Sequence, residues 1–114
     1  MIWIASMILA ACATFTTDAY RSLTVSYQAY DATLASMGDL YREGRITEAQ
    51  KDEAIKIGRA YKLAHNGAVA ALSKYEESGG DASKQAYLTA ATEASAALSR
   101  LLAYCRPFIE KGVK

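Results

Sequence analysis

The sequence predicts an all-α protein in which three helices run up, down and up as an antiparallel bundle, behind a separate apolar N-terminal segment. Glycine and proline are sparse, and the breaks that matter are Glu43-Gly44-Arg45 and Ser78-Gly79-Gly80-Asp81. Between these breaks, apolar residues recur at the three-four spacing of a heptad seam. No stretch competes with the period of two that a half-buried strand requires.

The first helix is predicted over residues 17–43. Thr16 or Thr17 can cap its start, and Gly44 suits its C-terminus, where a left-handed residue closes the last turn. Its seam is Tyr20, Leu23, Tyr27, Tyr30, Leu34, Met37 and Tyr41. We expect these large residues to meet small residues of the other two helices, because such pairs interdigitate without voids.

The second helix is predicted over residues 47–78, where Thr47 and Gln50 have the spacing of a capping box and Gly79 suits the end. Its seam is Ala54, Ile57, Tyr61, Ala64, Ala68, Ala71 and Tyr75. Gly58 and Gly67 each cost a helix interior about 1 kcal/mol relative to alanine. Close packing against another helix is the expected reason for both glycines.

The third helix is predicted over residues 81–111, with Asp81 as its cap. Its seam is Tyr87, Ala91, Ala94, Leu98, Leu101, Cys105 and Phe108. Short connections make neighbouring helices antiparallel. If the chain reverses at the two glycine breaks, Tyr27 falls near Tyr61, and Ala68 falls near Ala90 or Ala91.

The N-terminal segment is apolar from Ile2 to Leu9 except for Ser6, as in the central region of a signal peptide. It ends in Leu9-Ala10-Ala11-Cys12. This run resembles the lipobox of bacterial lipoproteins, with an aliphatic residue three before the cysteine and small residues directly before it. The resemblance implies that a signal peptidase cuts before Cys12, whose thiol takes a diacylglycerol.

The lipobox resemblance divides the chain into a signal peptide over 1–11, a lipidated N-terminus and linker over 12–16, and the bundle over 17–114. Ala13 stands where an Asp favours retention in the inner membrane, which implies the periplasmic face of the outer membrane. Acyl chains contribute about 0.8 kcal/mol for each buried methylene, so several chains make a firm anchor. The small size also resembles short lipoproteins that prophages encode.

The alternative for the apolar segment is a buried first helix with an incidental cysteine. No Lys or Arg precedes Arg21, whereas signal peptides open on positive charge. The apolar stretch to Phe15 is shorter than the roughly 20 residues of helix that span a bilayer. A buried first helix would have to break around Thr14, Thr16 and Thr17.

Composition and motifs argue against catalysis, cofactors, metal and nucleic acid. The chain has 13 basic and 12 acidic residues, so its net charge of +1 gives no pull toward nucleic acid. No hydrolase, zinc-peptidase, haem or phosphate-binding motif occurs. His65 is the only histidine and has no second ligand at metal-binding spacing. Cys105 is expected to be a buried apolar residue or, alternatively, half of an intermolecular disulfide.

The predicted function is that of a membrane-anchored lipoprotein that binds a protein partner or acts as a structural tether. The bundle end far from the anchor offers a mixed-charge partner surface, in which Arg42, Arg45, Arg106 and Lys111 gather beside Glu43, Glu48 and Glu110. An alternative is a site for a small aromatic ligand or a peptide along the tyrosines Tyr20, Tyr27, Tyr30 and Tyr61. A further alternative is a subunit of a larger envelope or phage-related assembly, with apolar faces widened by Leu63, Leu72, Leu88 and Leu102.

Overall fold

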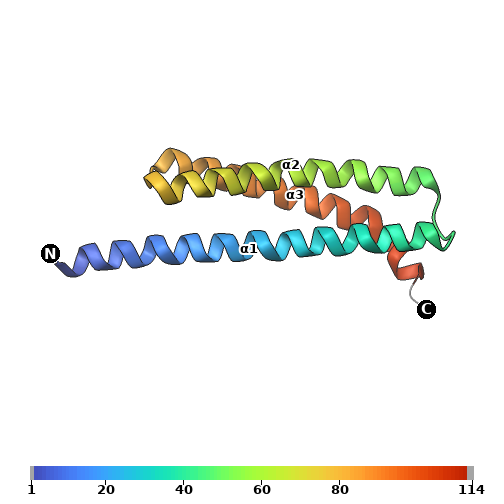
Figure 1. The fold of residues 1–114 in the computed structure, drawn as a ribbon, viewed down its shortest axis with the longest axis horizontal. Helices are drawn as coiled ribbons and strands as arrows, with labels where there is room; N and C mark the ends of the chain where they lie inside the picture. Colours follow the sequence, from blue (N-terminus) through green and yellow to red (C-terminus); the bar gives the residue numbers. More distant parts are fainter. Residues whose placement is uncertain (1, 113–114) are drawn as a thin grey trace.

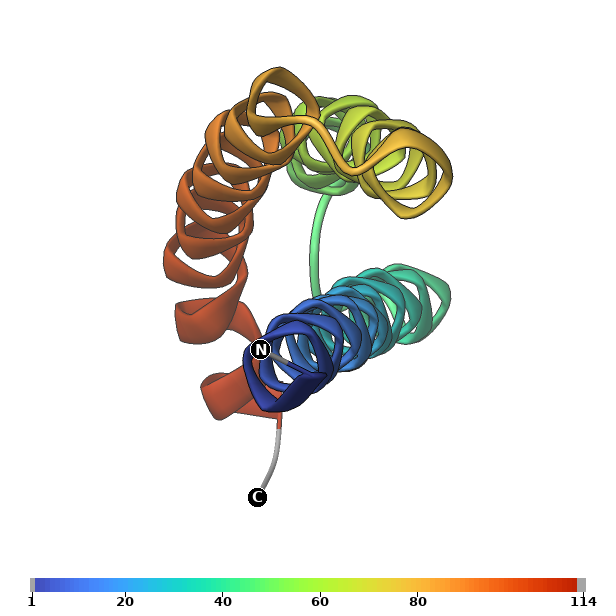
Figure 2. The same ribbon diagram turned by 90° about the vertical axis from the view of Figure 1, so that its left-hand side faces the viewer.

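The computed structural model describes the backbone of residues 2–112 and the side chains of residues 14–111. Three helices make up the fold: α1 (Ile2–Arg42), α2 (Glu48–Ser78) and α3 (Asp81–Gly112). They run up, down and up, and the described residues include no strand (Figure 1). Seen end-on in Figure 2, they occupy the corners of a triangle. The all-α three-helix bundle is therefore confirmed.

The start of α1 differs from the prediction. The helix begins at Ile2 and runs without interruption to Arg42, so the segment over 12–16 is helical and neither Thr16 nor Thr17 is its cap. Threonine costs a helix interior only a few tenths of a kcal/mol, less than the hydrogen bonds that a break would lose. The helix start predicted at residue 17 is therefore wrong, and α1 also lacks the break around the threonines that the alternative of a buried first helix required.

The turn between α1 and α2 follows from glycine chemistry. Gly44 has φ +73°, a conformation that a side chain disfavours. The Gly44 N–H donates to the carbonyl of Tyr41 at 3.0 Å, and the Arg45 N–H donates to that of Leu40 at 2.9 Å. This pair of bonds is a Schellman motif, which satisfies the last carbonyls of α1. The buried Ile46 then anchors the loop in the core.

The predicted capping box of α2 is confirmed. The Gln50 N–H donates to Thr47 Oγ1 at 3.1 Å, and the Thr47 N–H donates to Gln50 Oε1 at 2.8 Å. At the other end, Gly79 is left-handed with φ +65°, as predicted. Asp81 is the first residue of α3 instead of its cap, where its carboxylate favours the positive end of the helix dipole.

The three helices are not packed equally. α2 and α3 form the closest pair. Small residues line this contact, so a Cβ placed on Gly67 would lie only 3.9 Å from Ala90 Cβ. That pairing confirms the predicted register of α2 on α3 to within a residue. α1 presents Tyr, Leu and Met instead of alanine, and these larger side chains hold its backbone further from the other two helices.

The register of α1 on α2 is shifted by about one helical turn from the prediction. The ring of Tyr30, not that of Tyr27, stacks on Tyr61 with centroids 4.9 Å apart. Tyr27 lies against His65 instead, at 5.2 Å. The shift arises because the loop continues past Gly44, so the helices reverse direction beyond it. Two tyrosines meet in this layer, as they also do in the predicted register, so a large residue does not pair with a small one here.

The α1 seam is also rotated. Tyr27 and Tyr41 are each 37% exposed, although both were predicted to lie in the seam. The Lys51 ammonium group lies 4.2 Å from the centroid of the Tyr41 ring, a cation–π contact. The α1 side chains that are buried instead of these two are Ala19, Thr33 and Leu40.

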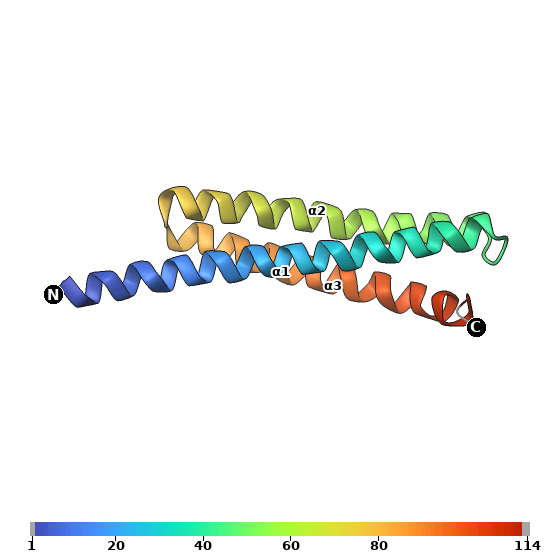
Figure 3. The same ribbon diagram turned by 60° about the horizontal axis from the view of Figure 1, so that its bottom comes forward.

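The bundle is long and narrow, with Cα extents of 65 × 25 × 17 Å. Its length comes partly from α1, whose N-terminal turns project past the turn between α2 and α3 (Figures 1 and 3). The opposite end carries the α1–α2 turn and the end of α3 (Figure 1). In the part of the chain that the structure describes, no helix is long and apolar enough to cross a membrane.

Candidate functional site

The point where α1 leaves the bundle is marked by Phe15. Its ring packs edge-on against Tyr75 and Tyr87, with centroids 5.4 Å and 5.8 Å away. Tyr75 is four residues before Gly79, or about 6 Å along a helix axis. Since α1 is antiparallel to α2, it passes the level of the α2–α3 turn close to residue 11.

The lipobox residues Leu9, Ala10, Ala11 and Cys12 belong to the helical backbone of α1. Their side chains lie outside the described part of the structure. Lipidation of Cys12 and cleavage before it therefore stay predictions, which depend on how an enzyme reads this stretch of sequence.

The predicted partner surface is exposed, and much of its charge is matched locally. Three of its four cations have a carboxylate within ion-pair distance, and the pairs are Arg42–Asp39, Arg45–Glu43 at 3.4 Å and Arg106–Glu110 at 4.0 Å. Lys111 is also exposed. Exposed pairs of this kind contribute about 0–1 kcal/mol each, so charges on a partner protein can replace them. The surface is therefore of mixed charge and solvated.

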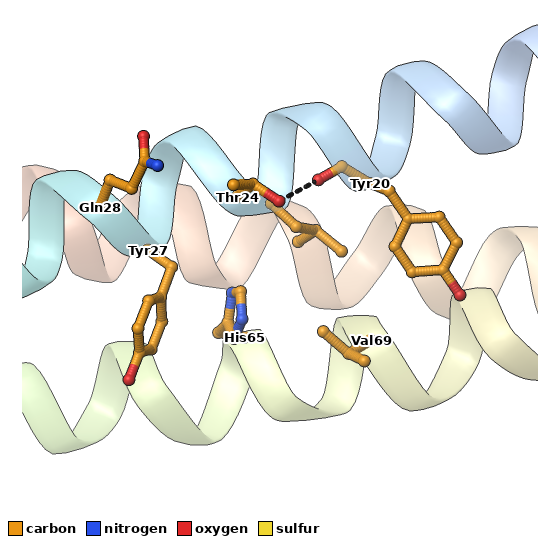
Figure 4. A pocket seen from close by; sticks show the side chains of 7 residues that line it. Tyr20, Thr24, Tyr27, Gln28, His65 and Val69 are labelled. Carbon is orange, nitrogen blue, oxygen red and sulfur yellow. Dashed lines mark hydrogen bonds between the residues drawn. The ribbon is translucent and has the colours of Figure 1, made fainter.

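The predicted tyrosine seam divides into two parts. Tyr30 and Tyr61 are buried and stacked on each other, so neither offers a free surface. Tyr20 and Tyr27 instead lie at the edge of a groove between α1 and α2 (Figure 4). This groove has a volume of about 390 Å³ and is lined by Tyr20, Leu23, Thr24, Tyr27, Gln28, His65 and Val69.

The Tyr20 end of the groove carries a carboxylate. The Tyr20 hydroxyl donates to Glu76 Oε2 at 3.1 Å, which ties α1 to α2. Desolvation, and then the neighbouring Glu76 carboxylate, raise the pKa of Tyr20 above its ordinary value, so this phenol keeps its proton at neutral pH. The Thr24 hydroxyl donates to the Tyr20 carbonyl at 2.9 Å, as Figure 4 shows.

His65 lies on the α2 wall of the groove, next to the seam residue Ala64. Its Nδ1 atom lies 3.3 Å from the hydroxyl of Tyr61, one helical turn earlier. Burial lowers the pKa of His65 below its ordinary value, so the ring is neutral at pH 7. The i, i+4 spacing of Tyr61 and His65 was the sequence signal for this pair.

We expect the free energy of unfolding to fall as the pH drops below about 6.5, the ordinary pKa of histidine. Burial lowers the pKa of folded His65, so the unfolded chain binds a proton at a higher pH than the folded chain does. This favours unfolding from about pH 6.5 down to the folded pKa. His65→Gln removes the titrating group, so urea titrations at pH 7.0 and 5.5 should differ less for the variant. An equal difference in both proteins contradicts the assignment.

The four leucines that were predicted to widen the apolar faces differ in burial. Leu72 is fully buried and Leu102 is half-buried, whereas Leu88 and Leu63 are 40% and 74% exposed. They do not form one exposed stripe, which weakens the argument for a larger assembly.

Cys105 is a free, fully buried thiol. Burial raises its pKa to about 11, so it is protonated and unreactive at neutral pH. The buried reading of this cysteine therefore fits the structure, and an intermolecular disulfide would require the bundle to open. Within the described residues, no group of three His, Cys, Asp or Glu side chains could hold a metal ion.

Comparison of the chain with protein-family models, curated proteins and solved structures finds no match.

Proposed function

We propose that the chain is a helical lipoprotein, anchored through Cys12 to the periplasmic face of the bacterial outer membrane. It acts there as a protein-interaction or structural tethering module without catalysis. The observation that carries the proposal is a coincidence of two boundaries. The lipobox resemblance predicts cleavage between residues 11 and 12. The contact of Phe15 with Tyr75 implies that α1 passes the end of the bundle close to residue 11.

Removal of residues 1–11 would leave the described core intact. Among the α1 side chains that the structure describes, which begin at residue 14, the first packed against that core is Phe15, and it lies C-terminal to the cut. Cys12 is three residues earlier, or about 4.5 Å along the helix. An acylated Cys12 would therefore hold the Gly79 turn close to the lipid and direct the opposite end of the bundle away from it.

That opposite end is where we expect a partner to bind. It carries the α1–α2 turn and the last turns of α3, together with the mixed-charge surface of Arg42, Arg45, Arg106 and Lys111 (Figure 1). Charged pairs at an exposed rim favour selective and fast encounter with a complementary surface more than high affinity. A protein partner with alternating charges fits this end best.

The test is the intact mass of the protein extracted from bacterial membranes. We expect a chain that begins at Cys12 and carries acyl groups. Cys12→Ser should stop both lipid labelling and cleavage while leaving the far-UV circular dichroism of the bundle unchanged. Cys105→Ala is the matched control and should still be lipidated. An unmodified chain from Met1 in membranes that process other lipoproteins would refute the proposal.

A further inference from the structure

The groove between α1 and α2 has the make-up of a small-molecule site. Tyr20 and Tyr27 are seven residues apart on α1, or about 10.5 Å along the helix. Figure 4 shows them at opposite ends of the groove, with His65 and Val69 of α2 between them. Tyr27 and Val69 are 37% and 36% exposed, so a ligand would remove apolar surface from water. A mainly apolar lining with a few polar groups is typical of such sites.

His65, which lines this groove, carries a hydrogen-bond donor. Tyr61 is fully buried, and a buried hydroxyl that donates to nothing is unfavourable, so the Tyr61 proton needs an acceptor. His65 Nδ1 is that acceptor, at 3.3 Å. A neutral imidazole that accepts at Nδ1 carries its hydrogen on Nε2. In the described part of the chain, His65 makes its hydrogen bond through Nδ1, which leaves Nε2 for a ligand.

The charges around the groove limit what can bind. The carboxylate of Glu76, held by Tyr20, lies at one end and disfavours an anion. The N–H group of His65 disfavours a cation and needs an acceptor. The ring faces of Tyr20 and Tyr27 favour a flat aromatic group, which stacks on them or meets them edge-on.

We propose that the groove binds a neutral aromatic molecule that carries a hydrogen-bond acceptor, such as an aromatic ketone. Its ring lies between Tyr20 and Tyr27, and its oxygen accepts the hydrogen bond from His65 Nε2. This site lies between the helices, away from both ends of the bundle, so it does not depend on the membrane anchor.

The test is a titration of the ¹⁵N-labelled full chain with acetophenone, followed by long-range ¹H–¹⁵N correlation spectra. His65 is the only histidine, so its two ring nitrogens give unique signals. We expect a saturable shift of His65 Nε2. Ethylbenzene lacks the acceptor and acetylcyclohexane lacks the aromatic ring, and each should bind at least about tenfold more weakly.

Two pairs of variants locate the site. Val69→Trp fills the groove and should abolish the shift, whereas Leu88→Trp places the same side chain on exposed α3 and should not. His65→Gln keeps an N–H donor near the Nε2 position and should retain more affinity than His65→Phe. These affinities are measured from backbone amide shifts, because both variants lack the histidine signal. Circular dichroism checks that each variant folds, and if His65→Phe does not, the tryptophan pair decides.

Several results would overturn the proposal. The first is the absence of a saturable shift up to about 10 mM acetophenone, a range in which even weak ligands bind. The second is equal binding of the three probes, and the third is unchanged binding to Val69→Trp. Tighter binding of phenyltrimethylammonium than of acetophenone would also refute it, because the groove would then select a cation through Glu76 and the tyrosine rings.

Discussion

Leu101→Ala is expected to lower the free energy of unfolding by about 2–5 kcal/mol. Leu101 has no exposed surface and belongs to the core cluster in which Met37 of α1, Tyr61 of α2 and Cys105 of α3 are also buried. Truncation therefore removes apolar contacts and leaves a cavity, which could close only if all three helices moved together. Urea denaturation followed by circular dichroism at 222 nm measures the loss.

Leu63→Ala is the matched control for Leu101→Ala. Leu63 has the same side chain and lies in the middle of α2, far from either helix end, but it is 74% exposed. Its truncation should change the free energy of unfolding by no more than about 0.5 kcal/mol. If the two variants lose the same stability, the core does not lie where the structure has it.

The ends of the helices could be predicted because residues within a few positions of each end determine them. Gly44 and Gly79 end their helices in the left-handed conformation that glycine adopts most easily. Thr47 and Gln50 form the capping box from side chains three residues apart. The number of helices, their order and most of their ends follow from such signals and from the apolar spacing.

The placement of α1 could not be predicted in the same way. A heptad pattern names a face of a helix but leaves its rotation uncertain, and Tyr27 has a ring large enough to pack from the edge of that face. The register of α1 on α2 depends on the residue at which the short loop reverses direction. The loop reverses beyond Gly44, so Tyr30 and not Tyr27 stacks on Tyr61. Because α2 and α3 meet through alanines, their seam tolerates little rotation, and its prediction succeeded.

Only part of the lining of the candidate groove could be predicted from the sequence. The sequence singled out Tyr20 and Tyr27 along with Tyr30 and Tyr61, but only the first two line the groove. Which tyrosines are buried depends on the rotation of α1. The donor on His65 depends on a hydrogen bond with Tyr61, whose direction follows from the burial of that phenol.

Gly58→Val is expected to lower the free energy of unfolding by about 1–3 kcal/mol, the usual cost of overpacking. A Cβ on Gly58 would lie 3.0 Å from Tyr30 Cε2 and 3.3 Å from Leu34 Cδ1. The Tyr30 ring cannot swing away easily, because it stacks on Tyr61 and lies beside Tyr27, with centroids 5.5 Å apart. Valine would therefore push α1 away from α2.

Gly38→Val separates this clash from the change in helix propensity. Both glycines lie inside helices, so both substitutions gain a few tenths of a kcal/mol of propensity. A Cβ on Gly38 would meet nothing within 4 Å, and this variant should be as stable as the parent or slightly more stable. Urea denaturation of the two variants gives the comparison. Equal stability would mean that α1 packs at Gly58 with more room than the structure has, because the close approach of Tyr30 and Leu34 is what makes the two positions differ.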